Sequence, residues 1–260
     1  PYTTLFRSDD GSKDTSCEIA QNFCKKHENW KLFKLEYNHG VSYARSFGIK
    51  NSVGKYISFV DSDDFTEPDF LKILYENIKD CQISICNYKK QIENSKISKN
   101  IFFHKSGIFS KNQILKSLIS DISLKSFLWN KLFERSLFDN IFMPQMCFED
   151  KIICLQLFSK IKKCCVTNKI LYNYNINKTS LTWQMNEKML DDYIKFSEFL
   201  KDFFCKKKEY KIFKFRHKFF CLHVFTLAFK VIFAKYKNKE INFRIFCKKF
   251  FENCQRIIRS

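Results

Sequence analysis

The chain contains little glycine and proline: only 5 Gly and 3 Pro stand among 260 residues, against 31 Phe. It has no glycine-rich phosphate-binding loop, and a sugar-1-phosphate nucleotidyltransferase would be expected to open with one. That class stays an alternative only if a preceding segment carries the loop. No zinc-finger or helix-turn-helix signature appears, so no nucleic-acid partner is expected. A hydrophobic content of 45% still indicates a folded protein with a substantial core.

The sequence also lacks a metal-ligand spacing of cysteines and a long apolar run. Three pairs of its 12 Cys lie two helical turns apart, which places each pair on one helix face: Cys17 and Cys24, Cys147 and Cys154, Cys247 and Cys254. The most apolar stretch, 219–233, is interrupted by His223 and Lys230 and is shorter than the roughly 20 residues of a membrane span. With no signal peptide visible, we expect buried thiols in a reducing cytoplasm, and this stretch either on a bilayer surface or in a core.

Positive charge is concentrated at the C-terminal end. The net charge is +19, and residues 185–260 contain 19 Lys or Arg against 8 Asp or Glu, which is +11. A basic, aromatic-rich helical region is attracted to an anionic membrane surface by about 1 kcal/mol per nearby basic residue. Peripheral contact with the inner face of the cell membrane is therefore one interpretation, and ordinary solvated helices are the other.

The most informative segment is Tyr56-Ile57-Ser58-Phe59-Val60-Asp61-Ser62-Asp63-Asp64, in which an apolar strand leads into three carboxylates. Carboxylates this close repel one another unless a cation binds them. Mg²⁺ takes one or two protein carboxylates and completes its shell with waters and substrate phosphates, so the pattern predicts a metal-held nucleotide. The alternative is a solvated acidic turn that caps a helix beginning near Pro68.

Further motifs stand in a fixed order around this segment. They are Asp9-Asp10-Gly11-Ser12, then Asn38-His39-Gly40-Val41-Ser42-Tyr43-Ala44-Arg45-Ser46-Phe47-Gly48, then Gly54-Lys55-Tyr56 before the strand and Asp64-Phe65-Thr66-Glu67-Pro68 after it. The ordered set resembles the inverting family-2 glycosyltransferases of the GT-A fold. The resemblance is strong over residues 9–85 and weaker to residue 182. One departure is Ser46, where the family usually has Asn.

The resemblance implies an α/β fold: a GT-A-like open, mostly parallel sheet flanked by helices, with a helical C-terminal extension. Helices are predicted at 13–28, 42–52, 68–80 and 111–119, and strands at 31–37, 56–60 and 82–88. Open sheets of this kind bind ligands at the carboxyl ends of their strands. Residues 9–184 would form the glycosyltransferase domain and residues 185–260 the basic helical region.

The first eight residues, 1–8, look like the translation of a sequencing adaptor joined to Asp9 and are set aside. The alternative is a real strand, because Leu5 and Phe6 are apolar and lead into the acidic turn. The family begins with a strand and a helix before its D-D-G-S motif. We therefore expect that first strand and helix to be missing from this chain, and the fragment by itself to be inactive if the missing elements are needed.

By resemblance, Asp9 and Asp10 contact the nucleobase or ribose of the donor. Asp61 and Asp63 hold the ribose and a Mn²⁺ or Mg²⁺ ion that bridges the two phosphates. Arg45 belongs to the same nucleotide-sugar site, where it is expected to tie loops together rather than to touch sugar.

A second acidic motif, Phe148-Glu149-Asp150, resembles the family's E-D motif. Inverting transfer needs a carboxylate that removes the proton of the acceptor hydroxyl, and Asp150 is the expected base, with Glu149 next. Two acids at a helix start also complement its dipole without any catalytic role.

Two further segments carry weaker resemblance. Trp129 and Lys131 match a family segment beside the acceptor, although Trp129 is equally explained as a core aromatic. Asn175 stands where the family often has an Arg that would serve the pyrophosphate, and Lys178 is a possible substitute.

The predicted function is that of a metal-dependent inverting glycosyltransferase. It would move a sugar from a nucleotide sugar, a UDP-sugar first of all, to a hydroxyl of a glycan or lipid-linked acceptor in surface polysaccharide synthesis. The alternative from another class is a membrane-associated scaffold whose GT-A-like domain has lost catalysis.

Overall fold

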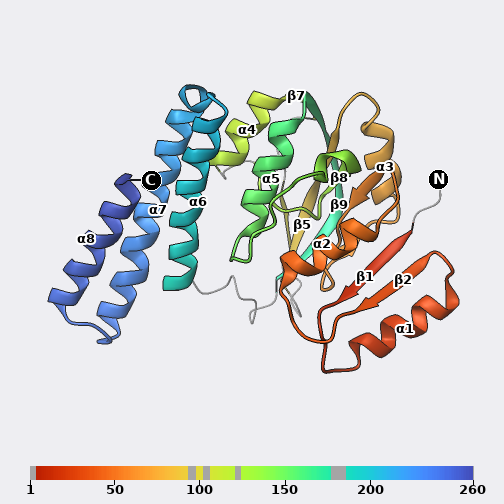
Figure 1. Cartoon of the computed structure of the whole chain (residues 1–260), viewed down its shortest axis with the longest axis horizontal. Helices are drawn as coiled ribbons and strands as arrows, with labels where there is room; N and C mark the ends of the chain where they lie inside the picture. The colour runs from red at the N-terminus through yellow and green to blue at the C-terminus, as the bar shows by residue number, and fades with distance from the viewer. Residues whose placement is uncertain (1–3, 93–97, 102–105, 121–123, 177–185, 260) are drawn as a thin grey trace.

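The computed structural model describes residues 4–92, 98–101, 106–120, 124–176 and 186–259. A central sheet lies between helices, with a small two-stranded sheet on one side and three C-terminal helices on the other (Figure 1). The fold is therefore mixed α/β with a helical C-terminal region, as expected. Lys178 and the boundary at residues 184 and 185 lie outside the described residues.

The N-terminal part forms a unit of its own. Strands β1 (Leu5–Asp9) and β2 (Trp30–Lys34) pair in parallel and are joined by α1 (Ser16–Lys26). Helix α2 (Val41–Asn51) packs on this pair, where Phe47 meets Phe33 edge to face at 5.1 Å. Strand β1 includes residues 5–8, which belong to the segment assigned to an adaptor. The apolar side chains of Leu5 and Phe6 agree with a strand at this position. The adaptor origin of residues 1–8 stays a prediction.

The larger sheet has the order β3-β8-β5-β9-β4, with β6 beside β5 and β7 beside β9. In chain order its strands are β3 (Tyr56–Ser58), β4 (Phe65–Thr66), β5 (Ile83–Ile92), β6 (Ser98–Ile101), β7 (Gly107–Ser110), β8 (Lys131–Glu134) and β9 (Lys163–Ile176).

Most neighbours in the larger sheet are antiparallel, in contrast to the mostly parallel sheet that the alternation of strands and helices indicates. Only β5 and β9 pair in parallel among its described pairings. Strands β3, β5 and β9 do run in the same direction, but β8 is inserted between β3 and β5 with the opposite direction. Short additional strands, which the helix-strand alternation does not reveal, account for the difference.

Helices cover both faces of the larger sheet. Alternate residues of β5 point to opposite sides, because successive side chains in a strand face opposite ways. Ile83 and Ile85 join the core on the side of α4 (Lys111–Ser120) and α5 (Glu149–Lys160), while Cys86 and Tyr88 pack towards α3 (Phe70–Asn77). A 3-10 turn, Arg135–Phe138, follows β8.

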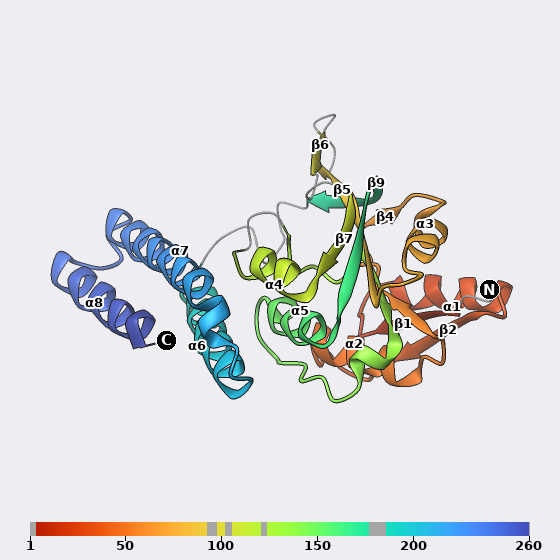
Figure 2. The same cartoon turned by 90° about the horizontal axis from the view of Figure 1, so that it is seen from above.

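Three C-terminal helices complete the fold: α6 (Glu187–Lys206), α7 (Tyr210–Lys237) and α8 (Phe243–Arg259). Helix α6 begins where the Asn186 side chain accepts a 2.9 Å hydrogen bond from the Met189 amide, a standard N-cap. Figure 2 shows α6 and α7 beside α4 and α5, with α8 outermost. Side chains of α6 and α7 such as Phe204, Phe213 and Val224 belong to the same core cluster as α5, so these helices are anchored to the central domain.

Candidate active site

A single arginine joins three carboxylates that are far apart in the sequence. Nη1 of Arg45 on α2 lies 2.7 Å from Glu149 Oε1 and 2.7 Å from Asp150 Oδ1, and Nη2 lies 3.2 Å from Asp61 Oδ1. The side chain of Arg45 is only 12% exposed. The strand-end carboxylate Asp61 and the helix-start pair Glu149 and Asp150 therefore meet at one partly buried cluster, which we call the Arg45 cluster (Arg45, Asp61, Glu149 and Asp150).

Burial controls the proton affinity of this cluster. Desolvation raises the pKa of Asp150 above the ordinary range of an aspartate, and the positive charge of Arg45 only partly opposes the rise. Desolvation would lower the pKa of Arg45, but the charges of Asp150, Asp61 and Glu149 outweigh it and raise that pKa instead. The guanidinium of Arg45 thus stays charged. The pKa of Asp150 is shifted towards neutral pH, and a general base works best when its pKa is near the working pH.

The backbone that presents Glu149 and Asp150 has an unusual conformation, held from α6. Phe148, the residue before the helix, has a left-handed φ of 62°, which is rare for a bulky side chain. Its ring contacts Tyr193 of α6 with centroids 4.5 Å apart, and the Cys147 amide donates a 2.9 Å hydrogen bond to Asp192 Oδ2. Asp192 and Tyr193 could not be identified from the sequence, because nothing in the pattern of α6 indicates that it reaches this loop.

The loop after β3 is fixed by β9. Asp64 is buried, and it accepts hydrogen bonds from the Tyr172 hydroxyl and the Asn175 amide, both at 2.8 Å. The Asn175 side chain donates to the carbonyl of Asp63 at 2.6 Å, and the Asp61 amide donates to the Tyr172 hydroxyl at 3.1 Å. Asn175, which stands where the family often has Arg, thus holds the acidic loop. Burial raises the pKa of Asp64 to about 6.

Asp61 and Asp63 suit a hard divalent ion by their chemistry. The Asp61 side chain is 35% exposed, and its Oδ1 forms an ion pair with Arg45. Asp63 is exposed to solvent. Within the described part of the chain, no group of three or more His, Cys, Asp or Glu side chains is arranged to hold a metal. Two carboxylates with open access match a Mg²⁺ or Mn²⁺ ion that completes its shell with waters and phosphate oxygens.

Asp10 and Asp9 have different surroundings. The two oxygens of Asp10 each accept a 2.8 Å hydrogen bond, from the amides of His39 and Gly40, and so organise the turn before α2. Asp9 is 6% exposed, and its Oδ1 accepts from the Ser12 hydroxyl. Its Oδ2 is buried without a hydrogen-bond partner among the described residues, which leaves an acceptor for a further group.

Aromatic rings that the sequence analysis did not single out stand beside Asp10. The His39 ring lies 4.5 Å from the rings of both Tyr37 and Tyr43, and these two tyrosines are 63% and 42% exposed. Exposed aromatic rings next to a polar turn offer a surface on which a nucleobase can stack.

Trp129 and Lys131 are buried below the site. Trp129 is 2% exposed and stacks on Tyr172 with centroids 4.3 Å apart. Lys131 has no exposed surface, and its Nζ donates to the Phe127 carbonyl at 2.5 Å and to Asn130 Oδ1 at 2.6 Å. Their predicted place at the acceptor does not fit this burial. Trp129 instead packs on Tyr172, which binds the acidic loop, and Lys131 is held by the segment before β8.

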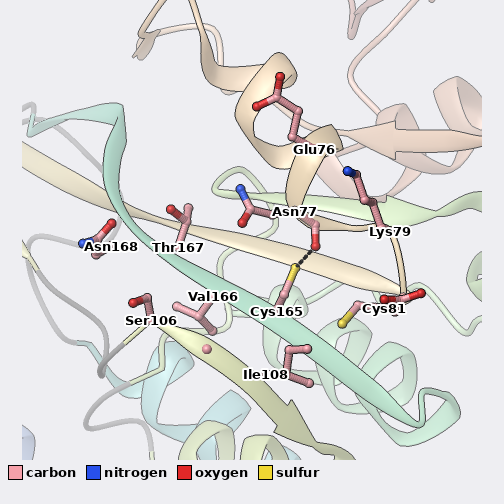
Figure 3. A pocket seen from close by; sticks show the side chains of 12 residues that line it. Glu76, Asn77, Lys79, Cys81, Ser106, Ile108, Cys165, Val166, Thr167 and Asn168 are labelled. Carbon is pink, nitrogen blue, oxygen red and sulfur yellow. Dashed lines mark hydrogen bonds between the residues drawn. The ribbon is translucent and has the colours of Figure 1, made fainter.

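A cavity of about 450 Å³ lies at the other end of β9, beside Cys81, Cys165 and Thr167 (Figure 3). The Cys165 thiol donates to the Asn77 carbonyl at 2.8 Å, and burial raises the pKa of both thiols, so neither is an activated nucleophile. Cys165 and Tyr172 are seven residues apart on β9, roughly 20 Å in an extended strand. This cavity contains none of the predicted site residues.

Comparison with known proteins identifies the family. The model of glycosyl transferase family 2 matches residues 5–142, more than half of the chain. The chain is 32% identical over 194 residues to the glycosyltransferase GlyA of Streptococcus pneumoniae, covering 70% of this chain and 27% of GlyA. It is 26% identical over 193 residues to the putative glycosyltransferase EpsH of Bacillus subtilis, covering 70% and 55%. The protein belongs to glycosyl transferase family 2.

Solved structures agree on the fold. The crystal structure of residues 1–349 of Staphylococcus aureus TarS aligns with a TM-score of 0.58 at 16% identity, covering all of this chain and 82% of the TarS chain. The same TarS fragment in complex with UDP gives the same score. The GT-A-like fold expected from the sequence is therefore confirmed. The chain spans about a quarter of GlyA and just over half of EpsH.

Proposed function

We propose that this protein transfers a sugar, with inversion, from a nucleoside diphosphate sugar to a hydroxyl group of a glycan or lipid-linked acceptor, as a step of surface polysaccharide synthesis. The Arg45 cluster is the observation that carries the proposal. It brings the carboxylate at the end of β3 next to the two carboxylates at the start of α5. A donor held at β3 and a base on α5 then face the same reacting centre.

Asp150 is the proposed base. It takes the proton of the acceptor hydroxyl as that oxygen attacks the anomeric carbon from the side opposite the diphosphate, so the product is inverted. Its Oδ1 is held by Arg45, which leaves Oδ2 to receive the proton. Glu149 keeps Arg45 in place and balances its charge. Proton transfer to a placed base of this kind contributes about 10²- to 10⁴-fold to rate.

Donor binding is assigned to Asp9, Asp10, Asp61 and Asp63. The free Oδ2 of Asp9 and the exposed rings of Tyr37 and Tyr43 are suited to a nucleobase, and UDP is the nucleotide to test first because a structural neighbour binds it. Asp61 and Asp63 would hold Mn²⁺ or Mg²⁺. Such an ion, when bound, neutralises the charge of the departing diphosphate. Asp64, Tyr172 and Asn175 keep the loop of these carboxylates in place.

Nucleotide binding with and without metal tests the donor site. The expected result is that UDP raises the melting temperature of the protein in the presence of Mn²⁺ and raises it less in its absence. Asp63→Ala should remove the Mn²⁺ effect. Asp69→Ala is the matched control, because Asp69 is an exposed aspartate six residues further along the chain, directly before α3. A Mn²⁺ effect that survives in Asp63→Ala, or that disappears equally in Asp69→Ala, would contradict the assignment.

A further inference from the structure

We infer that α7 and α8 form a docking surface for an anionic lipid bilayer, on which the protein lies without spanning it. Helix α7 has two apolar faces. Its inward side chains, among them Phe213, Phe220, Val224 and Ala228, are at most 2% exposed. A second apolar row on the other side of the same helix faces solvent.

The outer row of α7 follows helical spacing. Ile212, Phe215, Phe219 and Leu222 recur at intervals of three, four and three residues and are 46%, 74%, 41% and 60% exposed. At 100° per residue this row lies about half a turn away from the buried row. Four large exposed side chains on one stripe form a contiguous apolar surface of the kind that marks an interaction site.

Helix α8 extends this surface. Phe251 and Ile258 lie two turns apart on its outer side and are 63% and 79% exposed. Leu222 of α7 and Ile258 of α8 both line a groove of about 370 Å³ between the helices, so the two apolar rows meet there. Figure 2 shows that both helices lie at the end of the molecule remote from β1 and β2.

Basic residues share these rows. Lys211 and Lys218 alternate with Phe215 and Leu222 at intervals of four, three and four residues, which places all four on one face. On α8, Arg244 and Lys248 precede Phe251 at intervals of four and three. Long basic side chains beside aromatic rings can reach lipid headgroups while the rings enter the interface.

The balance of charge selects the partner. Helices α7 and α8 together contain 12 Lys or Arg and a single acid, Glu252. Three of these basic residues, Lys235, Lys249 and Arg256, are paired with acids of α6. Two copies of the protein meeting through this surface would bring like charges together. An anionic bilayer complements both the charge and the apolar rings, so the surface is assigned to lipid rather than to a second copy.

The same residues argue for lying on the membrane and against crossing it. By length and composition α7 is a candidate span, and 28% of its most apolar window is buried in the fold. However, Lys218 and Lys230 leave only 11 residues between them without a charge, whereas a span needs about 20 predominantly apolar residues. In addition, the inner face of α7 is part of the protein core, and crossing would require that core to open.

Vesicle flotation tests the proposal. The protein should bind phosphatidylcholine vesicles that contain about one-third phosphatidylglycerol, bind pure phosphatidylcholine far less, and be released by salt. The double variant Lys211→Gln with Lys218→Gln should bind about 30-fold more weakly, from about 1 kcal/mol for each lysine. The matched control is Lys72→Gln with Lys79→Gln, two exposed lysines on and beside α3, which should bind as the parent does.

The apolar contribution has its own pair of variants. Phe215→Ser with Leu222→Ser should weaken binding by at least as much as the lysine changes, whereas Val53→Ser with Phe142→Ser, which removes two exposed apolar side chains elsewhere, should not. Because all four side chains are exposed, the melting temperature and circular dichroism of each variant should match the parent.

Four outcomes would overturn the proposal: equal binding to neutral and anionic vesicles, no loss of binding in either double variant, resistance to alkaline carbonate extraction, or a dimer in solution that Phe215→Ser with Leu222→Ser dissociates. The third outcome would indicate a spanning helix and the fourth a second copy. Vesicle binding does not rest on the proposed sugar transfer. Asp150→Asn should leave it unchanged.

Discussion

Charged side chains are arranged in opposite ways in the Arg45 cluster and on the outer face of α7 and α8. In the cluster, three carboxylates from a loop and a helix start converge on one buried guanidinium, so a single positive charge inside the protein is shared by three acids. On the two helices, 12 basic residues and one acid stand on a surface that also exposes aromatic rings. In the cluster the chain itself supplies charges of both signs, whereas the two helices need a partner of opposite charge.

This difference teaches how each region can be tested. A partly buried ion cluster depends on every member, because the loss of one charge leaves another desolvated without compensation. Single substitutions there should have large effects on activity. An exposed basic surface acts through the sum of many weak, salt-screened contacts, so single changes should be small and several are needed to abolish binding.

The largest expected effect is the loss of the base from the cluster. Asp150→Asn keeps the size of the side chain and a hydrogen-bond acceptor for Arg45 but removes the group that takes the proton. We expect kcat to fall by about 10²- to 10⁴-fold while UDP binding persists, measured by turnover and by calorimetry. Asp139→Asn, a change of an exposed aspartate, is the control. Parental turnover in Asp150→Asn would remove Asp150 from the role of base.

The next effect concerns the pH dependence that Arg45 sets. A base must be ionised, so the rate should rise with pH through the pKa of Asp150, which burial has already raised. Arg45→Gln removes the cation that opposes this rise most, and the acidic limb of the pH-rate profile should move about 1 to 3 pH units towards alkaline pH. Arg45→Lys keeps a charge and should move it less. An acidic limb at the same pH in parent and Arg45→Gln would show that Arg45 does not act on the base.

A smaller effect is expected from the contact between α6 and the start of α5. Asp192→Ala removes the acceptor for the Cys147 amide, which should let Glu149 and Asp150 shift and should lower kcat by about 10- to 100-fold with little change in the KM of the donor. Asp192→Asn can still accept this hydrogen bond and should recover most of the rate.

The neighbouring residue provides the matched control for this contact. Asp191 pairs with Lys195 and Arg256 at the surface, so Asp191→Ala should leave kcat unchanged. Equal losses of kcat in Asp191→Ala and Asp192→Ala would mean that α6 acts only through general stability. A loss confined to Asp192→Ala would link the C-terminal helices to the site.

Much of the fold could be predicted because local signals agree with it. The helices expected at 42–52 and 111–119 are found at Val41–Asn51 and Lys111–Ser120, where apolar residues recur at helical spacing. The direction of the sheet neighbours could not be predicted in the same way. The pairing of β8 with both β3 and β5 depends on contacts between residues about 50 to 75 positions apart, which no local pattern records.

For the site as well, residues with a local motif could be predicted and residues placed by distant contacts could not. Carboxylates at strand and helix ends, such as Asp61 and Asp150, carry motif signals and were expected near each other. Burial of Lys131 could not be seen, because a lysine normally faces water and no local pattern indicates that β8 lies between β3 and β5 in the sheet. Asp192 gives no signal either, since an aspartate in a helix normally faces water.

The smallest effect concerns stability, and it probes the carboxylate that lies beside the cluster but outside it. Asp64 is buried without a cation, and its pKa is raised from 3.8 to about 6. The folded state therefore holds the proton more tightly than the unfolded state. The stabilisation is complete below about pH 4 and is lost as pH rises through about 6, a change of about 2 to 3 kcal/mol.

Asp64→Asn cannot ionise, so its free energy of unfolding should not show this loss. In denaturant titrations, the stability of the parent relative to Asp64→Asn should fall by about 2 to 3 kcal/mol between pH 4 and pH 7. Asp69→Asn, at an exposed position directly before α3, should follow the parent at every pH. If the difference between parent and Asp64→Asn were constant with pH, Asp64 would have the same pKa in the folded and unfolded states, which would contradict the raised pKa.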